Sequence, residues 1–250
     1  MKKDESKIRG ERSVRDNFFK FPSTPHLALP GDVDIRGDKV MSEPERDAFL
    51  GHKLVVEEKV DGANLGISFD SNGNIRAQNR GAYLSLPSLG QWKKLLEWLS
   101  PKEDILFDHL IDRYILFGEW CYAQHSVFYD RLPDWFLGFD IYDKQVGHFL
   151  STDKRDAFFR EMEISKVPFI AHGHFTFSDL KEFLSFSRLG DQLAEGLYLR
   201  FDQDNRLVQS TKLVRSDFIQ SIEQHWSRSG IKKNQVIWES YTTPSKSVVI

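Results

Sequence analysis

Short apolar stretches alternate with polar turns along the chain, and this pattern predicts more strand than helix. The stretches at 53–60, 114–120 and 136–142 are rich in valine, leucine and aromatic residues. Apolar runs of this length with aromatic and β-branched side chains are typical of strands that lie in a sheet. We therefore predict a strand at each of these three positions.

Two further pairs of strands are expected to form β-hairpins. Residues 65–69 and 75–78 flank a polar turn that contains Asn72-Gly73, and Asn-Gly is a strong hairpin signal. Residues 196–200 and 207–214 flank the polar stretch at 202–205 in the same way. Hairpins join neighbouring antiparallel strands, so the sheets should be mostly antiparallel.

Helices are predicted where apolar residues recur with a period near 3.6 after a capping residue. The longest has Leu89, Trp92, Leu95 and Leu99 on one face and should end at Pro101. Together with the strands, the helices indicate an α+β fold. The four predicted helices begin at Ser88, at Ser151 or Thr152, at Ser178 and at Ser216.

The domain organisation follows from where the apolar residues lie. Residues 1–17 are mostly charged and predict a flexible arm. Pro22 and Pro25 exclude a regular helix after it, so the phenylalanines at 18–21 should pack from an extended segment. We expect one domain over residues 18–216. Residues 217–250 should form a short helix and a tail, without an OB-fold domain.

Composition narrows the class of protein only a little. The net charge of −3 argues against a generally basic nucleic-acid coat, although it is compatible with a local basic groove. The single cysteine, Cys121, excludes an internal disulfide framework and a multi-cysteine zinc site. We expect no signal peptide and no membrane span, and hence a cytoplasmic protein.

A dense group of polar residues at 57–64 interrupts the apolar pattern. Glu57, Glu58, Lys59, Asp61 and Asn64 stand between apolar stretches on both sides. Unpaired burial of such groups would cost several kcal/mol, on the order of 2–7 each. They should therefore lie at an exposed edge or converge on a ligand. A strand-end turn is the simpler alternative for Lys59 and Asp61 alone, with Gly62 at positive φ.

Five later segments also carry residues that a core would not select. Glu119 and Glu195 are acids within apolar strand sequence, and such acids need a partner. Phe139 alone would be an ordinary core residue. The segments are Asn79-Arg80-Gly81, Phe117-Gly118-Glu119, Phe139-Asp140-Ile141, Glu195-Gly196-Leu197-Tyr198-Leu199-Arg200 and Lys212-Leu213-Val214-Arg215.

Taken in order with Lys59-Val60-Asp61-Gly62, these segments resemble motifs I, Ia, III, IIIa, IV and V of the covalent nucleotidyltransferases, the ligases and capping enzymes. The sequence is most similar to the ATP-dependent RNA ligases, especially their Rnl2-like branch. The resemblance spans residues 18–216. It implies a nucleotidyltransferase fold with the nucleotide between antiparallel sheets. It also implies that Lys59 takes AMP from ATP, and that AMP passes to a 5′-phosphate of RNA before a 3′-hydroxyl displaces it.

The resemblance also implies roles for single residues. Lys212 should neighbour the α-phosphate and, with partial desolvation, lower the pKa of Lys59. Glu195 should hold Mg²⁺ or Mn²⁺, and Glu119 the ribose hydroxyls. Phe139 should stack on adenine. The further expected nucleotide-binding residues are Glu57 or Glu58 at the adenine edge, Arg80 at phosphate or the RNA end, and Asp61, Gly62, Asn64 and Arg200.

Two departures from the family pattern keep alternatives open. Motif V often begins with a second lysine, but here Ser210 stands at that position, and Arg215 is a candidate for the missing cation. The stretch after Arg215 is also shorter than a ligase OB-fold domain requires. The alternatives are a nick-sealing DNA ligase and a non-catalytic nucleotide- or RNA-binding module that acts with an RNA repair partner.

Overall fold

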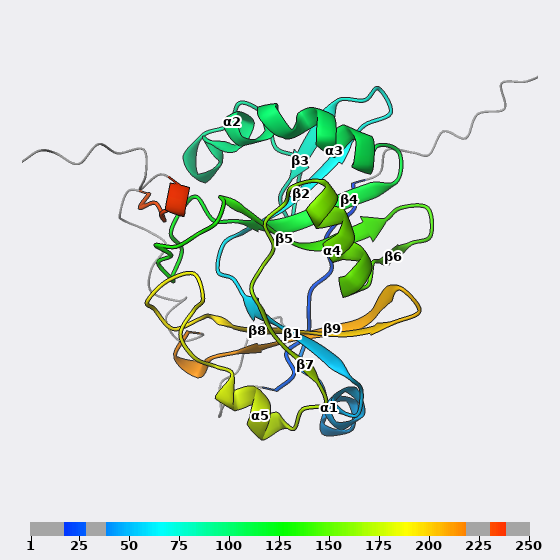
Figure 1. Cartoon of the computed structure of the whole chain (residues 1–250), viewed down its shortest axis with the longest axis vertical. Helices are drawn as coiled ribbons and strands as arrows, with labels where there is room; N and C mark the ends of the chain where they lie inside the picture. Colours follow the sequence, from blue (N-terminus) through cyan, green and yellow to red (C-terminus); the bar gives the residue numbers. More distant parts are fainter. Residues whose placement is uncertain (1–17, 29–38, 219–230, 239–250) are drawn as a thin grey trace, which may run out of the picture.

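Two antiparallel sheets face each other, and a helical layer covers the outer side of each (Figure 1). The computed structural model describes residues 18–28, 39–218 and 231–238. One sheet has the strand order β7-β1-β8-β9, and the other has the order β3-β2-β4-β5-β6. The strands are β1 (Leu54–Lys59), β2 (Ala63–Phe69), β3 (Ile75–Gln78), β4 (Tyr114–Trp120), β5 (Phe136–Asp143), β6 (His148–Phe149), β7 (Phe169–Gly173), β8 (Gly196–Gln203) and β9 (Arg206–Val214).

Each sheet buries its apolar outer face under two of the helices. In Figure 1, α2 and α3 lie over the five-stranded sheet, and α1 and α5 lie under the four-stranded sheet. Leu106 of α3 belongs to the core cluster of the five-stranded sheet. Phe49 of α1 and Leu180 of α5 belong to the core cluster of the four-stranded sheet. The helices are α1 (Glu43–Leu50), α2 (Leu95–Leu99), α3 (Glu103–Leu110), α4 (Thr152–Glu161) and α5 (Phe177–Glu182).

The predicted strands and hairpins are confirmed, and so is the α+β class, whereas β6 and β7 were not among the predicted strands. The hairpin of β2 and β3 pairs Phe69 with Ile75, and that of β8 and β9 pairs Gln203 with Arg206. The predicted extended segment at 18–27 also packs as expected, because Phe19 and Phe21 contact Phe117. In the part of the chain that the structure describes, no helix has the length and apolar character needed to cross a membrane.

The helix expected from Ser88 to Pro101 is wrong. Gly90 adopts a positive φ of 64°, so the path divides into a 3-10 turn (Gly90–Trp92) and the short α2. Pro101 does not end the helical path. It lies in the first turn of a second 3-10 helix (Ser100–Lys102), where its missing N–H leaves no hydrogen bond unmade, and the chain continues into the unpredicted α3.

Two other helix starts also differ from the predictions. Thr176, not Ser178, caps α5, and it forms a capping box with Asp179. Helix α1 was not predicted, although its own capping box of Ser42 and Glu45 was visible in the sequence. The helix predicted after Ser216 lies mostly outside the described residues. The proposed boundaries of the arm, the domain and the tail stay predictions.

Candidate active site

The polar segment at 57–64 is where the chain crosses from one sheet to the other. Lys59 is the last residue of β1 in the four-stranded sheet, and Ala63 is the first residue of β2 in the five-stranded sheet. Gly62 is required by close approach and not by a positive φ, because a Cβ there would lie 3.0 Å from the carbonyl oxygen of Trp120. Because it connects the two sheets, the segment borders the space between them.

A cavity of about 180 Å³ lies at this crossing and gathers most of the predicted site residues. Sequence reasoning missed several apolar and hydroxyl-bearing members of its wall. Phe21 and Thr24 belong to the proline-rich segment, for which the sequence predicts only packing on the domain. The cavity is lined by Phe21, Thr24, Glu57, Glu58, Lys59, Val60, Asn64, Arg80, Glu119, Phe139, Val167, Glu195, Tyr198 and Lys212.

The ammonium of Lys59 lies against a carboxylate at the centre of this cavity. Its Nζ is 2.6 Å from Oε1 of Glu195, which directly precedes Gly196, the partner of Lys59 across the β1–β8 ladder. Burial lowers the pKa of Lys59, but the charges of Glu195 and Glu119 outweigh it, and the pKa lies above its ordinary value. The expected lowering by Lys212 is therefore not achieved by the protein's own groups.

Glu119 faces the same cavity from the opposite sheet. It lies on β4 directly across from Asn64 on β2. Burial raises the pKa of Glu119 to about 8, and burial likewise raises the pKa of Glu195 to about 7. Oε2 of Glu119 and Oδ1 of Asn64 are buried without a hydrogen-bond partner. Such atoms are costly unless a ligand or water satisfies them, so these two point to a bound polar ligand.

The donor set fits a hydrated divalent cation beside a phosphate-bearing ligand. No group of three or more histidine, cysteine or acidic side chains within the described residues could enclose a metal ion. Mg²⁺ retains several waters and uses one or two carboxylates plus substrate phosphates, so Glu195 suffices as the protein ligand. A cation there would also relieve the unfavourable burial that raises the pKa of both acids.

Lys212 reaches the cavity from β9, where its strand partner is Tyr198 of β8. The proline-rich segment holds the backbone at this position. The N–H of Lys212 donates to the carbonyl of Pro25 at 3.0 Å, and the N–H of Leu27 donates to the carbonyl of Lys212 at 2.8 Å. This segment therefore supplies cavity wall and fixes the strand that carries the second lysine.

The two glutamates before Lys59 lie on opposite faces of β1, because side chains alternate along a strand. Glu58 accepts hydrogen bonds from the Ser187 hydroxyl and from the N–H of Arg188 at 2.9 Å. Glu57 shares the face of Lys59, and its two oxygens accept from Arg155 at 2.6 and 3.0 Å. Both carboxylates are thus already bound within the protein, which weakens their expected role at the adenine edge.

Three predicted contacts lie beside the cavity and not in its lining. Gly62 packs against β4, and Asp61 accepts the N–H groups of Ser126 and Val127 at 2.6 and 2.9 Å. Arg200 is fully buried, and its Nη1 lies 2.6 Å from Oδ1 of Asp140. Arg200 is therefore part of the internal framework, and its direct contact with the nucleotide stays a prediction.

Arg215 does not supply the positive charge that is missing because Ser210 stands in place of a lysine. Its guanidinium pairs with Asp217 and donates to the carbonyl of Ala194 at 2.9 Å, outside the cavity lining. Ser210 instead hydrogen-bonds Tyr198, which also contacts Thr24. The position of the usual motif V lysine is thus occupied by a hydroxyl network and not by a second positive charge.

The fold and the cavity define a two-sheet protein with a half-buried lysine paired to a buried acid, and comparison with known proteins assigns its family. A family model described as RNA ligase matches residues 52–214, more than half of the chain. The chain therefore belongs to the RNA ligase family. No curated protein matches it.

Solved structures with a similar fold include several of a Naegleria gruberi RNA ligase. A variant with ATP and Mn superposes with a TM-score of 0.55 at 15% identity, covering 72% of this chain and 55% of that one. A variant with AMP and Mn has a TM-score of 0.57 at 16% identity, with coverages of 84% and 66%. An apo variant has a TM-score of 0.55 at 18% identity, covering 71% of this chain and 54% of that one. The chain thus spans about half to two thirds of the relative's length, and the likeness concerns the fold.

Proposed function

We propose that the chain is an ATP-dependent RNA ligase of the Rnl2-like branch, with a nucleotidyltransferase fold. It joins a 5′-phosphate to a 3′-hydroxyl through a lysyl-AMP intermediate and an adenylated polynucleotide. The observation that carries this proposal is the convergence of Lys59, Glu119, Glu195 and Lys212 on one cavity between the sheets. Family membership and the ATP- and AMP-bound relatives support it.

In the first step, Nζ of Lys59 attacks the α-phosphorus of ATP, a P–N bond forms and pyrophosphate leaves. The attacking amine must first lose a proton, so its ion pair with Glu195 has to be broken. A divalent cation held by Glu195 supplies charge neutralisation when bound. The ammonium of Lys212 adds positive charge where the phosphates lie, and loss of the Glu195 contact then favours the neutral amine of Lys59.

Glu119 and Asn64 hold the sugar in this proposal. Their unpartnered buried oxygens are acceptors for the ribose hydroxyls, which are donors. Phe139 and Val167 offer apolar surface for the base, and exposed Arg80 at the cavity rim binds phosphate or the RNA end. In the later steps AMP passes from Lys59 to a 5′-phosphate, and a 3′-hydroxyl displaces it to seal the strand.

The decisive experiment is transfer of label from α-labelled ATP to the polypeptide in the presence of Mg²⁺, detected after denaturation. We expect label on the wild type and none on Lys59→Ala or Lys59→Arg. Lys53→Ala is the matched control, since Lys53 is an exposed lysine just before the same strand. Absence of label on wild type and control would overturn the proposal in favour of a binding module.

A comparison of RNA and DNA ends tests the substrate. Strands that carry the adenylate already and differ only in the sugar at the 3′-hydroxyl end isolate the sealing step. Because the 2′-hydroxyl is the group that distinguishes RNA from DNA, we expect faster sealing of the ribose end. Equal or faster sealing of the deoxyribose end would instead favour a nick-sealing DNA ligase.

A further inference from the structure

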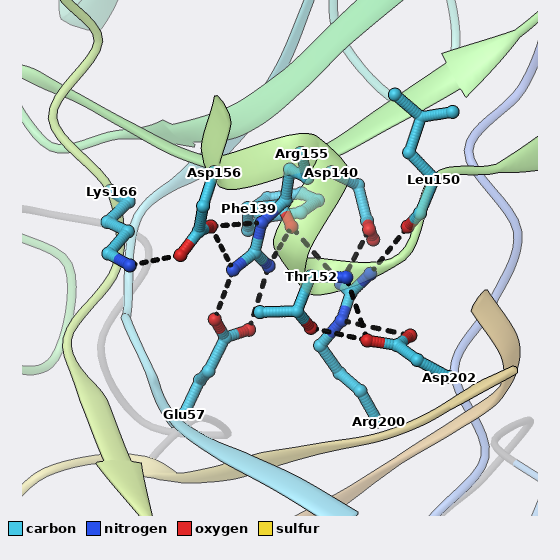
Figure 2. Close-up of polar contacts among 10 residues, drawn as sticks. All are labelled: Glu57, Phe139, Asp140, Leu150, Thr152, Arg155, Asp156, Lys166, Arg200 and Asp202. Carbon is cyan, nitrogen blue, oxygen red and sulfur yellow. Dashed lines mark hydrogen bonds and ion pairs between the residues drawn. The ribbon is translucent and has the colours of Figure 1, made fainter. Parts of the chain in front are cut away.

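A fully buried arginine outside the cavity uses every donor that it has. Arg155 lies on α4, and its guanidinium carries five N–H groups. Two bind Glu57, two bind Oδ1 of Asp156, and the fifth donates to the backbone carbonyl of Phe139 at 2.7 Å (Figure 2). Asp156 also pairs with Lys166. The orientation of this guanidinium is therefore fixed on all sides.

The carbonyl of Phe139 also accepts a hydrogen bond from a second arginine, Arg200. Nη1 of Arg200, on β8, donates to it at 3.2 Å and to Asp140 at 2.6 Å. Nη2 of Arg200 donates to the carbonyl of Leu150 at 3.1 Å. Figure 2 shows the two guanidiniums on either side of this one oxygen. A carbonyl oxygen has two lone pairs, so the pair of arginines accounts for its full accepting capacity.

Phe139 is the residue at which strand β5 leaves its regular pairing. Along the β4–β5 ladder, Phe117 pairs with Asp140 and Gly118 pairs with Gly138, so Phe139 is an extra residue without a partner. This is a β-bulge, a feature that redirects a side chain and is frequent beside active sites. Because the ladder supplies no donor for the Phe139 carbonyl, the arginines take that place.

The same bulge places the Phe139 ring in the cavity wall. Gly138 permits it, because a Cβ there would lie 2.7 Å from Cζ of Phe159 on α4. The ring is half-buried and meets Phe21 edge-on at 5.3 Å. A buried ion pair is weak evidence for stability, since apolar residues of equal volume often stabilise as well. Two buried arginines on one carbonyl are better explained by the geometry that they impose.

We propose that Arg155 and Arg200 are positioning residues for the nucleobase: they hold the bulge at Phe139 so that its ring offers a stacking face in the cavity. Arg155 extends this control to Glu57 on β1, two residues before Lys59. The bulge of one sheet and the lysine strand of the other are thus held by one guanidinium. The inference rests on the proposed function, because it takes the nucleobase of ATP as the ligand of Phe139.

A double-mutant cycle on nucleotide affinity tests this positioning role. The quantity measured is the ratio of the Kd for ribose 5-triphosphate to the Kd for ATP, which isolates the part of binding that depends on the base. Base–aromatic stacking contributes about 1–3 kcal/mol by alanine substitution, so Phe139→Ala should lower the ratio by about 5- to 140-fold. Arg155→Lys should lower it by about 5-fold, since an ammonium has three donors in place of five.

The cycle separates positioning from general loosening. Arg155→Lys combined with Phe139→Ala should be no worse than Phe139→Ala alone, within about 2-fold, because both changes remove the same stacking contact. Arg160→Lys is the matched control on the exposed side of α4 and should leave the ratio unchanged. Arg200→Lys repeats the test from β8, so the proposal stays testable if Arg155→Lys fails to fold. Thermal unfolding of each variant sets the temperature of the binding measurement.

Two outcomes would overturn the inference while leaving the proposed function intact. If Arg155→Lys and Arg200→Lys weakened the binding of ATP and of ribose 5-triphosphate equally, the two arginines would have a merely structural role. Additive losses in the double variant would show that the arginines do not act through Phe139. If the wild type binds neither nucleotide, or if base removal costs it nothing, the proposed function or its assignment of Phe139 fails first.

Discussion

Nζ of Lys59 lies 2.6 Å from Oε1 of Glu195, at the point where β1 and β8 begin to diverge. A lysine held in this way is an ammonium, because the carboxylates raise its pKa above the ordinary value. A nucleophile needs the free amine. The resting contact is therefore an ion pair, and the adenylation step proposed above has to break it.

Lys59→Ala separates the first step from the last. Without the amine, transfer of AMP from ATP and sealing of a 5′-phosphorylated strand should both be abolished. A pre-adenylated strand bypasses the first step, so the variant should retain some sealing of it. A gel assay with both strands measures this. The role of Lys59 would be wrong if the variant sealed pre-adenylated ends no better than plain ones.

Glu195→Gln should make the first step depend more steeply on the divalent cation. The amide keeps the shape of the side chain but removes the charge that the cation requires. We expect lysyl-AMP formation at fixed Mg²⁺ to fall by about 100-fold, the magnitude typical of a lost electrostatic group, and to recover in part at higher Mg²⁺. Titration of label transfer against Mg²⁺ measures it, with the exposed Glu182→Gln as control. An unchanged Mg²⁺ requirement would contradict Glu195 as the metal ligand.

Deprotonation of the buried Glu119 carboxyl should make the nucleotide-free protein less stable as the pH rises. Its pKa is raised from 4.5 to about 8 by burial, so between these values the folded state binds a proton that the unfolded state has released. Stability therefore falls across this window, and below pH about 4.5 the effect vanishes. Glu119→Gln mimics the protonated acid and should raise Tm by about 3 °C at the alkaline end.

The measurement is thermal unfolding of wild type and Glu119→Gln in parallel at several pH values. The difference in Tm between the two proteins should grow with pH and disappear in acid. A constant difference, or one that shrinks as the pH rises, would show that Glu119 is not the buried acid described here.

The ion pair between Arg155 and Glu57 should couple strongly in stability. Arg155→Met leaves the Glu57 carboxylate buried without its bidentate partner, which typically costs about 3–5 kcal/mol. Changing both residues to methionine removes the unpaired charge and should restore most of that loss. Denaturant unfolding of Arg155→Met, Glu57→Met and the double variant measures the coupling. Additive losses in the double variant would contradict it.

Asn234 should stabilise the loop that holds the turn after Lys59. Its amide donates to the carbonyls of Cys121 and Ala123 at 2.8 and 3.3 Å, and its oxygen accepts the N–H of Tyr129 at 2.9 Å. The Tyr129 hydroxyl in turn accepts the N–H of Asp61 at 2.8 Å. Asn234→Ala leaves these buried groups unsatisfied and should cost about 2 kcal/mol.

Lysyl-AMP formation by Asn234→Ala should fall as well, because the loop supports Asp61. Gln235→Ala is the neighbouring control, since Gln235 is exposed and its hydrogen bond to Tyr129 is made by the backbone. Unfolding and label transfer are measured on both variants. Wild-type behaviour of Asn234→Ala in both assays would exclude this bracing role.

Local sequence signals were enough to predict both hairpins, every strand except β6 and β7, and most of the residues that line the cavity. Strand β4 and hairpin β2–β3 were predictable because their apolar period and the turn at Asn72-Gly73 act locally. Lys59, Glu119 and Glu195 were found because charged residues within apolar strands are costly without a partner, and the resemblance to ligase motifs added Lys212. These signals depend on residues that are near one another in the chain.

Which polar residues line the cavity and which support it from outside depends on how the two sheets pack. The sequence treats Arg80 and Arg200 alike as candidate ligands, but Arg80 lies in the cavity lining, whereas Arg200 is buried and pairs with Asp140. The bulge at Phe139 and the contribution of Thr24 depend on contacts between distant segments. Local periodicity carries no information about such contacts, because pairing across sheets is set by packing of the whole chain.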